Sequence, residues 1–555
     1  MKSLKLTYLF TIVFSVVFFI TSCNDDKAKD KDKNGGVENV NWKSNVFGSI
    51  DGTIAFVGSF DFMEIMDKSS IMDADIIPEM YKSMFMGYID SDNLGIKLEG
   101  NNHYAVVMDN NGEFDYAFAF ANVLDAKKIA TNLHMYLGGR TDNEDGYEFL
   151  KTSDGVVFGW DDQHLIAAVS DRRRSDVNQL KNKIKKLLDA RNKDVEADDQ
   201  LLAYLKRDDD INMYMNMKSY MDFIKNINMN NELTELYSNE EFLKLMDYTM
   251  VSTANFNNGE IIMDLKMINN GNGFKYLKDQ PVGAEYLNYL TDNDRMIASA
   301  FANIDLDTYI SFLKPMLNSN LDVYNDFNDF LTQIGLSENE IFNIFNGELA
   351  ISIIDILEPE NSIEQEFSDD FGEWEDDFFD EMDEYGYDSP SKEPVPSFLF
   401  TLGINDQSAL MKLMANAPVN VVKDQVIEIE NDVHLLLKDN KLFLGSPQEL
   451  MNKLNVAGSL STYSKINSID YPVYCYFNTD ASSYPDIVTS TLEREGGLEI
   501  FRDIMSLFNS FEIKGTNNKI SYEIIMSNKG ENSLKQIMDM IIKLAKENNP
   551  GLMNV

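Results

Sequence analysis

One local pattern of hydrophobic and polar positions recurs along the chain: an apolar stretch with strand character, a polar residue, and then an amphipathic helix. In the first half the stretches are residues 54–57, 116–120 and 211–215, followed by Asp61, Asp125 and Asn216. In the second half they are residues 297–301, 398–402 and 473–477, followed by Asp305, Asp406 and Asn478. Asp and Asn accept hydrogen bonds from the unpaired N–H groups of a helix start, so each junction is expected to cap a helix.

The elements between these junctions repeat in the same order. The stretch 156–170, which turns near residue 162, matches the stretch 433–446, which turns near residue 439. A hairpin over residues 248–266, with Asn258-Gly259 at its tip, matches a hairpin over residues 511–526. The pattern predicts an α+β fold of two similar lobes from an internal duplication, each an antiparallel sheet with helices packed on one face.

These repeats and the composition between them predict five segments. They are a lipoprotein signal peptide (1–22), a flexible tether (23–47), a first α+β lobe (48–280), a second α+β lobe (281–530), and a C-terminal helix and tail (531–555). The tether is expected because residues 24–36 are polar or glycine apart from Ala28.

The N-terminus has the pattern of an export signal. Lys2 and Lys5 precede an apolar stretch from Leu9 to Ile20, which is too short to span a bilayer comfortably. The run Ile20-Thr21-Ser22-Cys23 resembles the lipobox of bacterial lipoproteins, in which the cysteine thiol receives a diacylglyceryl group. Cys23 is therefore the predicted lipidation site, carrying palmitate-like acyl chains. An ordinary signal peptide with a chance cysteine is the alternative.

Two further features connect the chain with a known family. Asp25-Asp26, just after Cys23, resembles the surface-export signal of Bacteroidetes-type lipoproteins. The lipobox, the repeated units and the run Phe345-Asn346-Gly347-Glu348-Leu349-Ala350 resemble a family of large Bacteroidetes-type envelope lipoproteins known only as a domain of unknown function. The resemblance implies an outer-membrane lipoprotein, exposed at the cell surface or otherwise facing the periplasm. It implies no activity and no catalytic residue.

Composition narrows the classes of partner. The 555 residues include 92 acidic and 48 basic side chains, a net charge of −44, which disfavours binding to nucleic acid. Two cysteines are too few for a disulfide framework or a cysteine-based zinc site.

Charge is also concentrated locally. An insertion at 358–393 contains 16 acidic residues, one lysine and seven aromatic residues. It is interpreted either as an arm that docks a partner or collects cations, or as a solubilising loop. Residues 171–194 are locally basic and could meet anionic headgroups or the acidic insertion. The alternative is a solvated helix whose Val177, Leu180, Ile184 and Leu187 pack inward.

The sequence contains no specific motif for chemistry. None of the four histidines lies at metal-ligand spacing from another, and no nucleophile elbow, Walker loop or dinucleotide fingerprint occurs. Cys475 lies in a strand-like run and is expected to be a buried thiol. The sequence therefore predicts no catalytic residue, no metal ligand and no cofactor-binding residue.

The resulting expectation is a lipid-anchored cell-envelope protein that acts as a non-enzymatic binding or interaction scaffold. Its expected partners are the membrane, through the anchor, and another envelope protein or an apolar ligand. A lipid or lipoprotein carrier with an apolar cavity is the main alternative, and a carboxylate-based envelope hydrolase is a weaker one.

Overall fold

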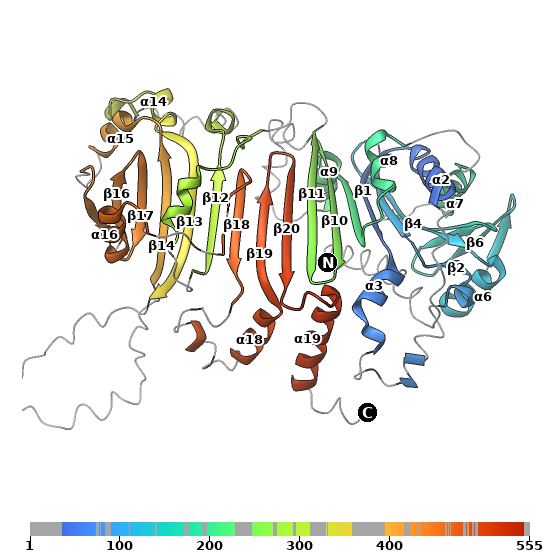
Figure 1. Cartoon of the computed structure of the whole chain (residues 1–555). Coiled ribbons are helices and arrows are strands. Elements are labelled where there is room, and N and C mark those ends of the chain that lie inside the picture. Colours follow the sequence, from blue (N-terminus) through green and yellow to red (C-terminus); the bar gives the residue numbers. More distant parts are fainter. Residues whose placement is uncertain are drawn as a thin grey trace, which may run out of the picture. The chain divides into compact units, whose positions relative to one another are not determined.

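The computed structural model describes residues 36–548 apart from internal gaps, the longest of which cover residues 228–246, 311–328 and 358–394. The chain forms two compact units: unit 1 is residues 1–275 with 515–555, and unit 2 is residues 276–514. Both contain antiparallel strands and helices, so the fold is mixed α+β (Figure 1). The division differs from the expected lobes, because residues 519–526 form a strand that pairs within unit 1.

Unit 1 is built on an antiparallel sheet. Its strands are β1 (Thr53–Phe60), β2 (Ile96–Lys97), β3 (Asn102–Met108), β4 (Phe114–Val123), β5 (Thr141–Glu144), β6 (Tyr147–Lys151), β7 (Val157–Trp160), β8 (His164–Val169), β9 (Ile211–Asn216), β10 (Tyr248–Asn257), β11 (Glu260–Asn269) and β20 (Lys519–Met526). They pair in the order β5–β6–β7–β8–β4–β3–β1–β9–β10–β11–β20, with β2 also beside β4.

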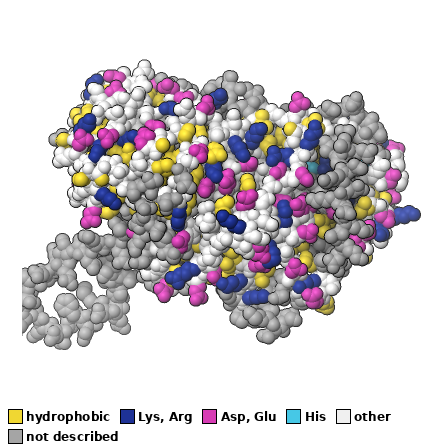
Figure 2. Space-filling view, in the orientation of Figure 1, with side chains coloured by type: hydrophobic (Ala, Val, Ile, Leu, Met, Phe, Trp, Pro, Cys, Tyr) yellow, Lys and Arg dark blue, Asp and Glu magenta, His cyan; other side chains and the backbone are white. Residues whose placement is uncertain are grey.

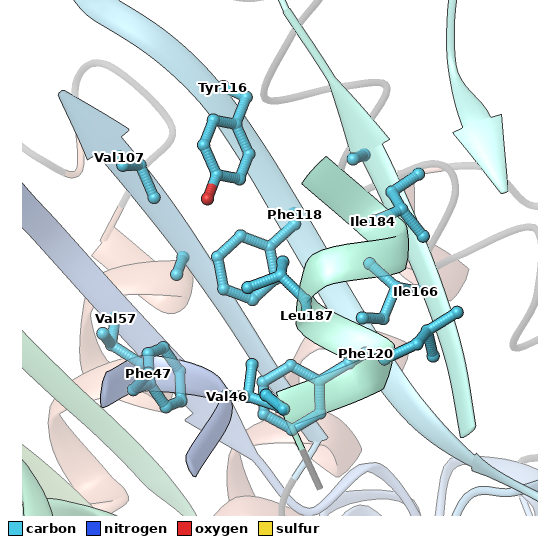
Figure 3. Close-up of a cluster of buried hydrophobic side chains, with 14 of the residues drawn as sticks. Val46, Phe47, Val57, Val107, Tyr116, Phe118, Phe120, Ile166, Ile184 and Leu187 are labelled. Carbon is cyan, nitrogen blue, oxygen red and sulfur yellow. The ribbon is translucent and has the colours of Figure 1, made fainter. Parts of the chain in front are cut away.

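Helices cover both faces of this sheet. They are α2 (Gly36–Gly48), α3 (Phe62–Ser69), η1 (Ile71–Asp73), α5 (Ser91–Leu94), α6 (Ala126–Leu137), α7 (Val177–Asp189), α8 (Asp199–Leu205), α9 (Met217–Ile227) and α19 (Ser533–Asn548). On one face Phe118 and Phe120 of β4 pack with Ile184 and Leu187 of α7 (Figure 3). On the other face Ala117 of β4 belongs to a cluster with side chains of α6.

The expectation of helices on one face is therefore wrong for unit 1. The physical reason lies in β4, where Tyr116, Phe118 and Phe120 alternate with Ala117 and Ala119. Both sets of alternate side chains are apolar, and a strand of that kind is stable when both faces of its sheet are covered.

The predicted tether ends earlier than expected. Residues 36–47 belong to α2, in which Trp42, Val46 and Phe47 are buried in the core of unit 1. The Trp42 ring stacks on the His164 imidazole at a centroid distance of 3.7 Å. Burying a large apolar side chain stabilises a fold by about 1.5–3 kcal/mol, so these three residues hold α2 against the sheet.

Unit 2 is also built on an antiparallel sheet. Its strands are β12 (Ala298–Asn303), β13 (Phe345–Leu357), β14 (Val395–Ile404), β15 (Val426–Glu430), β16 (Val433–Lys438), β17 (Lys441–Ser446), β18 (Val473–Asn478) and β19 (Phe508–Gly515). Seven of them pair in the order β15–β16–β17–β14–β13–β12–β18. Phe477 of β18 stacks on Phe511 of β19 at a centroid distance of 5.1 Å.

Buried clusters lie on both faces of this sheet, so the expectation of helices on one face is wrong for unit 2 as well. The helical elements of the unit are η3 (Ala284–Tyr289), α14 (Glu338–Phe342), α15 (Gln407–Met414), α16 (Gln448–Ala457) and α18 (Leu498–Ser506). On one face Leu435 and Leu437 of β16 belong to a cluster with Ala409 and Leu410 of α15.

The larger cluster lies on the opposite face. Phe301 of β12, Leu399 of β14 and Tyr474 of β18 form one buried cluster with Tyr286 of η3 and Leu454 of α16. The capping box expected at Ser337 and Glu340 is present at the start of α14.

Candidate functional site

Cys23, the predicted lipidation site, lies outside the residues that the structure describes, and so does the acidic insertion 358–393. Both therefore stay predictions from sequence. The insertion supplies 16 of the acidic residues and one lysine. Elsewhere the described surface is mixed in charge: Figure 2 shows Lys and Arg side chains interspersed with Asp and Glu over the face that it presents.

Five of the six polar residues at the strand ends cap the start of a helix as the sequence predicts, and Asn478 instead accepts its hydrogen bond in a stretch that is not helical. Each of the six accepts a hydrogen bond from a backbone N–H shortly after it: Asp61 from Glu64, Asp125 from Lys127 and Lys128, Asn216 from Ser219, Asp305 from Thr308, Asp406 from Ala409, and Asn478 from Asp480. These side chains stabilise helix starts and turns, and this structural role accounts for their positions.

Asp61 shows how burial acts on one of these caps. Its second carboxylate oxygen accepts a hydrogen bond from the Gly100 N–H at 2.9 Å. Burial raises the pKa of Asp61 above its usual value, although both backbone hydrogen bonds oppose that rise. A raised carboxyl pKa is a feature of general acids, but here the oxygens are engaged by backbone groups.

The described part of the basic stretch, residues 177–190, contains the core helix α7, whose lysines are neutralised, while residues 171–176 and 191–194 lie outside the described residues. Leu180, Ile184 and Leu187 of α7 are buried, which confirms that they pack inward, and Leu188 is buried with them. Val177 is partly buried against the same core. The four lysines of α7 each form an ion pair with an aspartate: Lys181 with Asp142, Lys183 with Asp115, Lys185 with Asp145, and Lys186 with Asp51. Because each positive charge has a nearby carboxylate, α7 offers little attraction for anionic headgroups.

The candidate functional site is instead the second face of the sheet in unit 2. Directly paired residues of neighbouring antiparallel strands lie on the same face of a sheet. Ala300 of β12 pairs with Ile351 of β13 and with Cys475 of β18, and Ile351 pairs with Phe400 of β14. These four residues form one apolar row across four strands, on the face opposite to Phe301 and Leu399.

Two further rows extend this face. One row is Ala298, Ile353, Phe398 and Phe477, and the other is Ala302, Leu349, Leu402 and Val473. We call the twelve residues of the three rows the apolar face. Each of the twelve is apolar or a thiol, and none is charged.

The apolar face is open to solvent at its centre. The exposed fraction is 40% for Ile351, 37% for Ile353 and 38% for Phe477. At β17 the same face is covered, because Leu442 and Leu444, which pair with Leu402 and Phe400, pack against the cluster that contains Ala409 and Leu410 of α15. An antiparallel sheet normally presents polar side chains where a face is not covered. Large apolar side chains left exposed together are typical of interaction sites.

The chemistry of the apolar face is that of contact rather than of proton or electron transfer. Its one titratable group is the Cys475 thiol, and burial raises the pKa of that thiol. Cys475 is therefore predominantly uncharged at neutral pH, which makes it a weak nucleophile. The face can bury apolar surface of a partner, but it offers no acid, base or charged ligand.

In the described part of the chain, no group of three or more His, Cys, Asp or Glu side chains is arranged to hold a metal ion. His103 and His434 are 3% and 2% exposed, so neither faces solvent.

The motif Asn346-Gly347-Glu348 has a structural role. Gly347 has a φ of +88°, and a Cβ there would lie 1.9 Å from the carbonyl oxygen of Ile304. Glu348 accepts a hydrogen bond from the Gly283 N–H at 2.9 Å, next to the start of η3. The motif thus bends the start of β13 and joins it to η3, where β13 loses its regular register with β14.

Within the described residues, none of the helices has the length and apolar character needed to cross a membrane.

Comparisons with known proteins identify no family. No family model matches the chain, and no curated protein matches it. Among solved structures, crystal form I of TP0453 shares 9% identity at a TM-score of 0.24, over 40% of this chain and 77% of that one. Crystal form IV of TP0453 shares 10% identity at a TM-score of 0.21, over 41% of this chain and 82% of that one.

Sequence reasoning missed the apolar face. The runs Phe398-Leu399-Phe400 and Val473-Tyr474-Cys475 carried a signal, because apolar residues at consecutive strand positions put apolar side chains on both faces of a sheet. Which of the two faces stays open depends on how the helices pack.

Proposed function

We propose that this chain is a cell-envelope lipoprotein, anchored through Cys23, that binds a partner through the apolar face of unit 2 without catalysing a reaction. The partner is another envelope protein that buries an apolar surface of its own against Ile351, Ile353 and Phe477. The lipid anchor would hold the chain on the outer membrane, which is its second partner. The chain would then face the cell surface or the periplasm.

The observation that carries this proposal is the exposure of large apolar side chains on a regular sheet. The side chains of Ile351, Ile353 and Phe477 are 37–40% exposed, and strand pairing holds their backbones in fixed register. A preorganised surface loses little conformational entropy when it binds, so more of the gain from apolar burial becomes affinity.

Two features support a non-enzymatic role. The carboxylate and amide oxygens at the strand ends accept hydrogen bonds from backbone N–H groups. The thiol on the apolar face has a raised pKa, opposite to what a nucleophilic cysteine requires.

The same apolar face gives a lipid carrier some support, because an acyl chain would also bind an uncharged apolar surface. The two roles differ in what accompanies the purified protein. The protein-partner role predicts a stoichiometric protein that is lost from the Phe477→Asp variant. Bound lipid in a solvent extract, lost from the same variant, would favour the carrier instead.

A second part of the proposal is the internal duplication. The order β6–β7–β8–β4–β3–β1–β9 in unit 1 has the same connectivity as the order β15–β16–β17–β14–β13–β12–β18 in unit 2. In unit 1 the first capped strand, β1, lies between β3 and the third capped strand, β9. In unit 2 the first capped strand, β12, lies between β13 and the third capped strand, β18. Caps at equivalent strand ends, Asp61 and Asp305, add to this support.

The duplication is tested by an experimental structure of each unit. Superposition of the seven strands should place Asp61 on Asp305 and Asn216 on Asn478. Strand paths that cannot be superposed would show that the two orders arose independently.

A further inference from the structure

In the ladder between β11 and β20, equivalent positions of the two strands pair symmetrically about the centre of the ladder. Both strands belong to unit 1, and they pair antiparallel from Glu260 opposite Ile525 to Lys266 opposite Lys519. Met263 and Tyr522 face each other at the centre of this ladder.

Each strand follows a tight turn. Asn257 pairs with Glu260, so Glu260 is the first residue of β11 after the turn. The Thr516 N–H donates to the Lys519 carbonyl oxygen at 2.7 Å, so Lys519 is the first residue of β20 after its turn. Glu260 and Lys519 are therefore equivalent positions.

Counted from these positions, the ladder uses the same seven residues of each strand, 260–266 and 519–525. The fourth residue of β11 faces the fourth residue of β20, the first faces the seventh, and the second faces the sixth. This is the pattern that a two-fold axis through the centre of an antiparallel pair produces, in which the same patch meets itself. A shift by one residue would abolish it.

The side chains follow the same symmetry. Positions two, four and six are apolar in both strands: Ile261, Met263 and Leu265 in β11, and Ile520, Tyr522 and Ile524 in β20. The other face of the ladder carries most of the polar residues, among them Asp264 and Ser521.

We infer that β11 is a self-complementary strand edge and that the partner it fits is a second copy of itself, a place that β20 now takes within the chain. Paired with another β11 in this register, Glu260 would face Lys266 at both ends of the ladder, and Ile261 would face Leu265. The opposite charges of Glu260 and Lys266 match twice in such a pair. The inference rests on the duplication proposed above, since β20 takes the place of β11 only if the two are repeats.

The full chain offers a direct test by grafting the sequence of β11 onto β20. The graft needs Lys519→Glu, Ser521→Ile, Tyr522→Met, Glu523→Asp, Ile524→Leu and Ile525→Lys, while Ile520 already matches. The grafted ladder would place a lysine at position 525 opposite Glu260 and a glutamate at position 519 opposite Lys266. A matched control carries Ile525→Glu with the other five substitutions, which sets two carboxylates opposite each other.

The graft also removes the contacts of Asp264 with Lys519 and Ser521, so the loss of these contacts should make it melt below the parent chain. The inference predicts that the graft stays folded and that the control melts lower than the graft. Adding Glu260→Lys to the control should restore the melting temperature, because it re-forms an opposed pair of opposite charge. A graft that unfolds unit 1, or a melting temperature that ignores the charge at residue 525, would overturn the inference. Failure of the duplication itself would appear separately, as strands of the two units that do not superpose.

Discussion

Across the β11–β20 ladder, the Asp264 carboxylate lies 2.8 Å from Lys519 Nζ and also accepts a hydrogen bond from the Ser521 hydroxyl. Burial opposes ionisation of Asp264, but the hydrogen bonds from Lys519 and Ser521 outweigh it and hold its pKa below the usual 3.8. A carboxyl group with a lowered pKa in the folded state stabilises that state when ionised.

The first prediction follows from the sign of this shift. The stabilisation by Asp264 is fully present above the unfolded-state pKa and is lost as pH falls through the lower folded-state pKa. Asp264→Asn should therefore reduce the loss of unit 1 stability below pH 4, relative to the parent chain. Urea unfolding followed by a probe in unit 1 at several pH values measures it, and Lys519→Met should have the same effect. An unchanged pH profile in both variants would contradict this role.

The second prediction concerns Gly347. Gly347→Ala forces a Cβ against the Ile304 carbonyl and a left-handed φ on an L-residue. We expect a loss of about 3 kcal/mol or more in the unfolding free energy of unit 2. Gly335→Ala is the matched control, since Gly335 has a φ of +66° and nothing within 4 Å of the added Cβ. It should lose only about 1 kcal/mol, and equal losses in the two variants would refute the close-approach argument.

The third prediction separates the two sides of α7. Ile184 is fully buried, and Ile184→Ala should destabilise unit 1 by about 2–5 kcal/mol. Lys181 pairs with the exposed Asp142, and Lys181→Ala should cost at most about 1 kcal/mol. Neither substitution should change sedimentation with anionic vesicles. Vesicle binding that depended on Lys181 would show that α7 is a membrane-binding helix after all.

The fourth prediction concerns the anchor. Cys23→Ala should move the protein from the membrane fraction to the soluble fraction or leave its signal peptide uncleaved, because the acyl chains that hold it would be missing. Cys475→Ala removes the other cysteine and should leave fractionation unchanged. A processed Cys23→Ala protein that remained with the membrane would exclude lipid anchoring at this residue.

Local features of the fold could be predicted from the sequence because local interactions decide them. Asp61 and Asp406 cap helices through neighbours three residues away, and the Ser337–Glu340 capping box lies within one turn. The α2 helix could not be predicted in the same way. Trp42, Val46 and Phe47 follow a polar stretch that reads as linker, and only the pocket formed by distant strands makes their burial favourable.

The candidate site depends on still longer-range information. The pairing of β12 with β13 and β18 joins residues far apart in the chain, and it alone puts Ala300, Ile351 and Cys475 in one row. The pairing of β11 with β20 is of the same kind and explains why the expected boundary after residue 530 differs from the observed units.

The central claim is that the apolar face of unit 2 contacts a partner in the envelope. The most direct test places a photo-cross-linking amino acid at Ile351 in the full chain, expressed in intact cells. Val456 provides the control, because it is apolar and 89% exposed but lies on α16, outside the apolar face.

We expect one discrete protein adduct from position 351, none from position 456, and loss of the adduct when Phe477→Asp is added. An adduct of equal yield from both positions, or none from position 351 in correctly anchored protein, would contradict a partner-binding role for the apolar face.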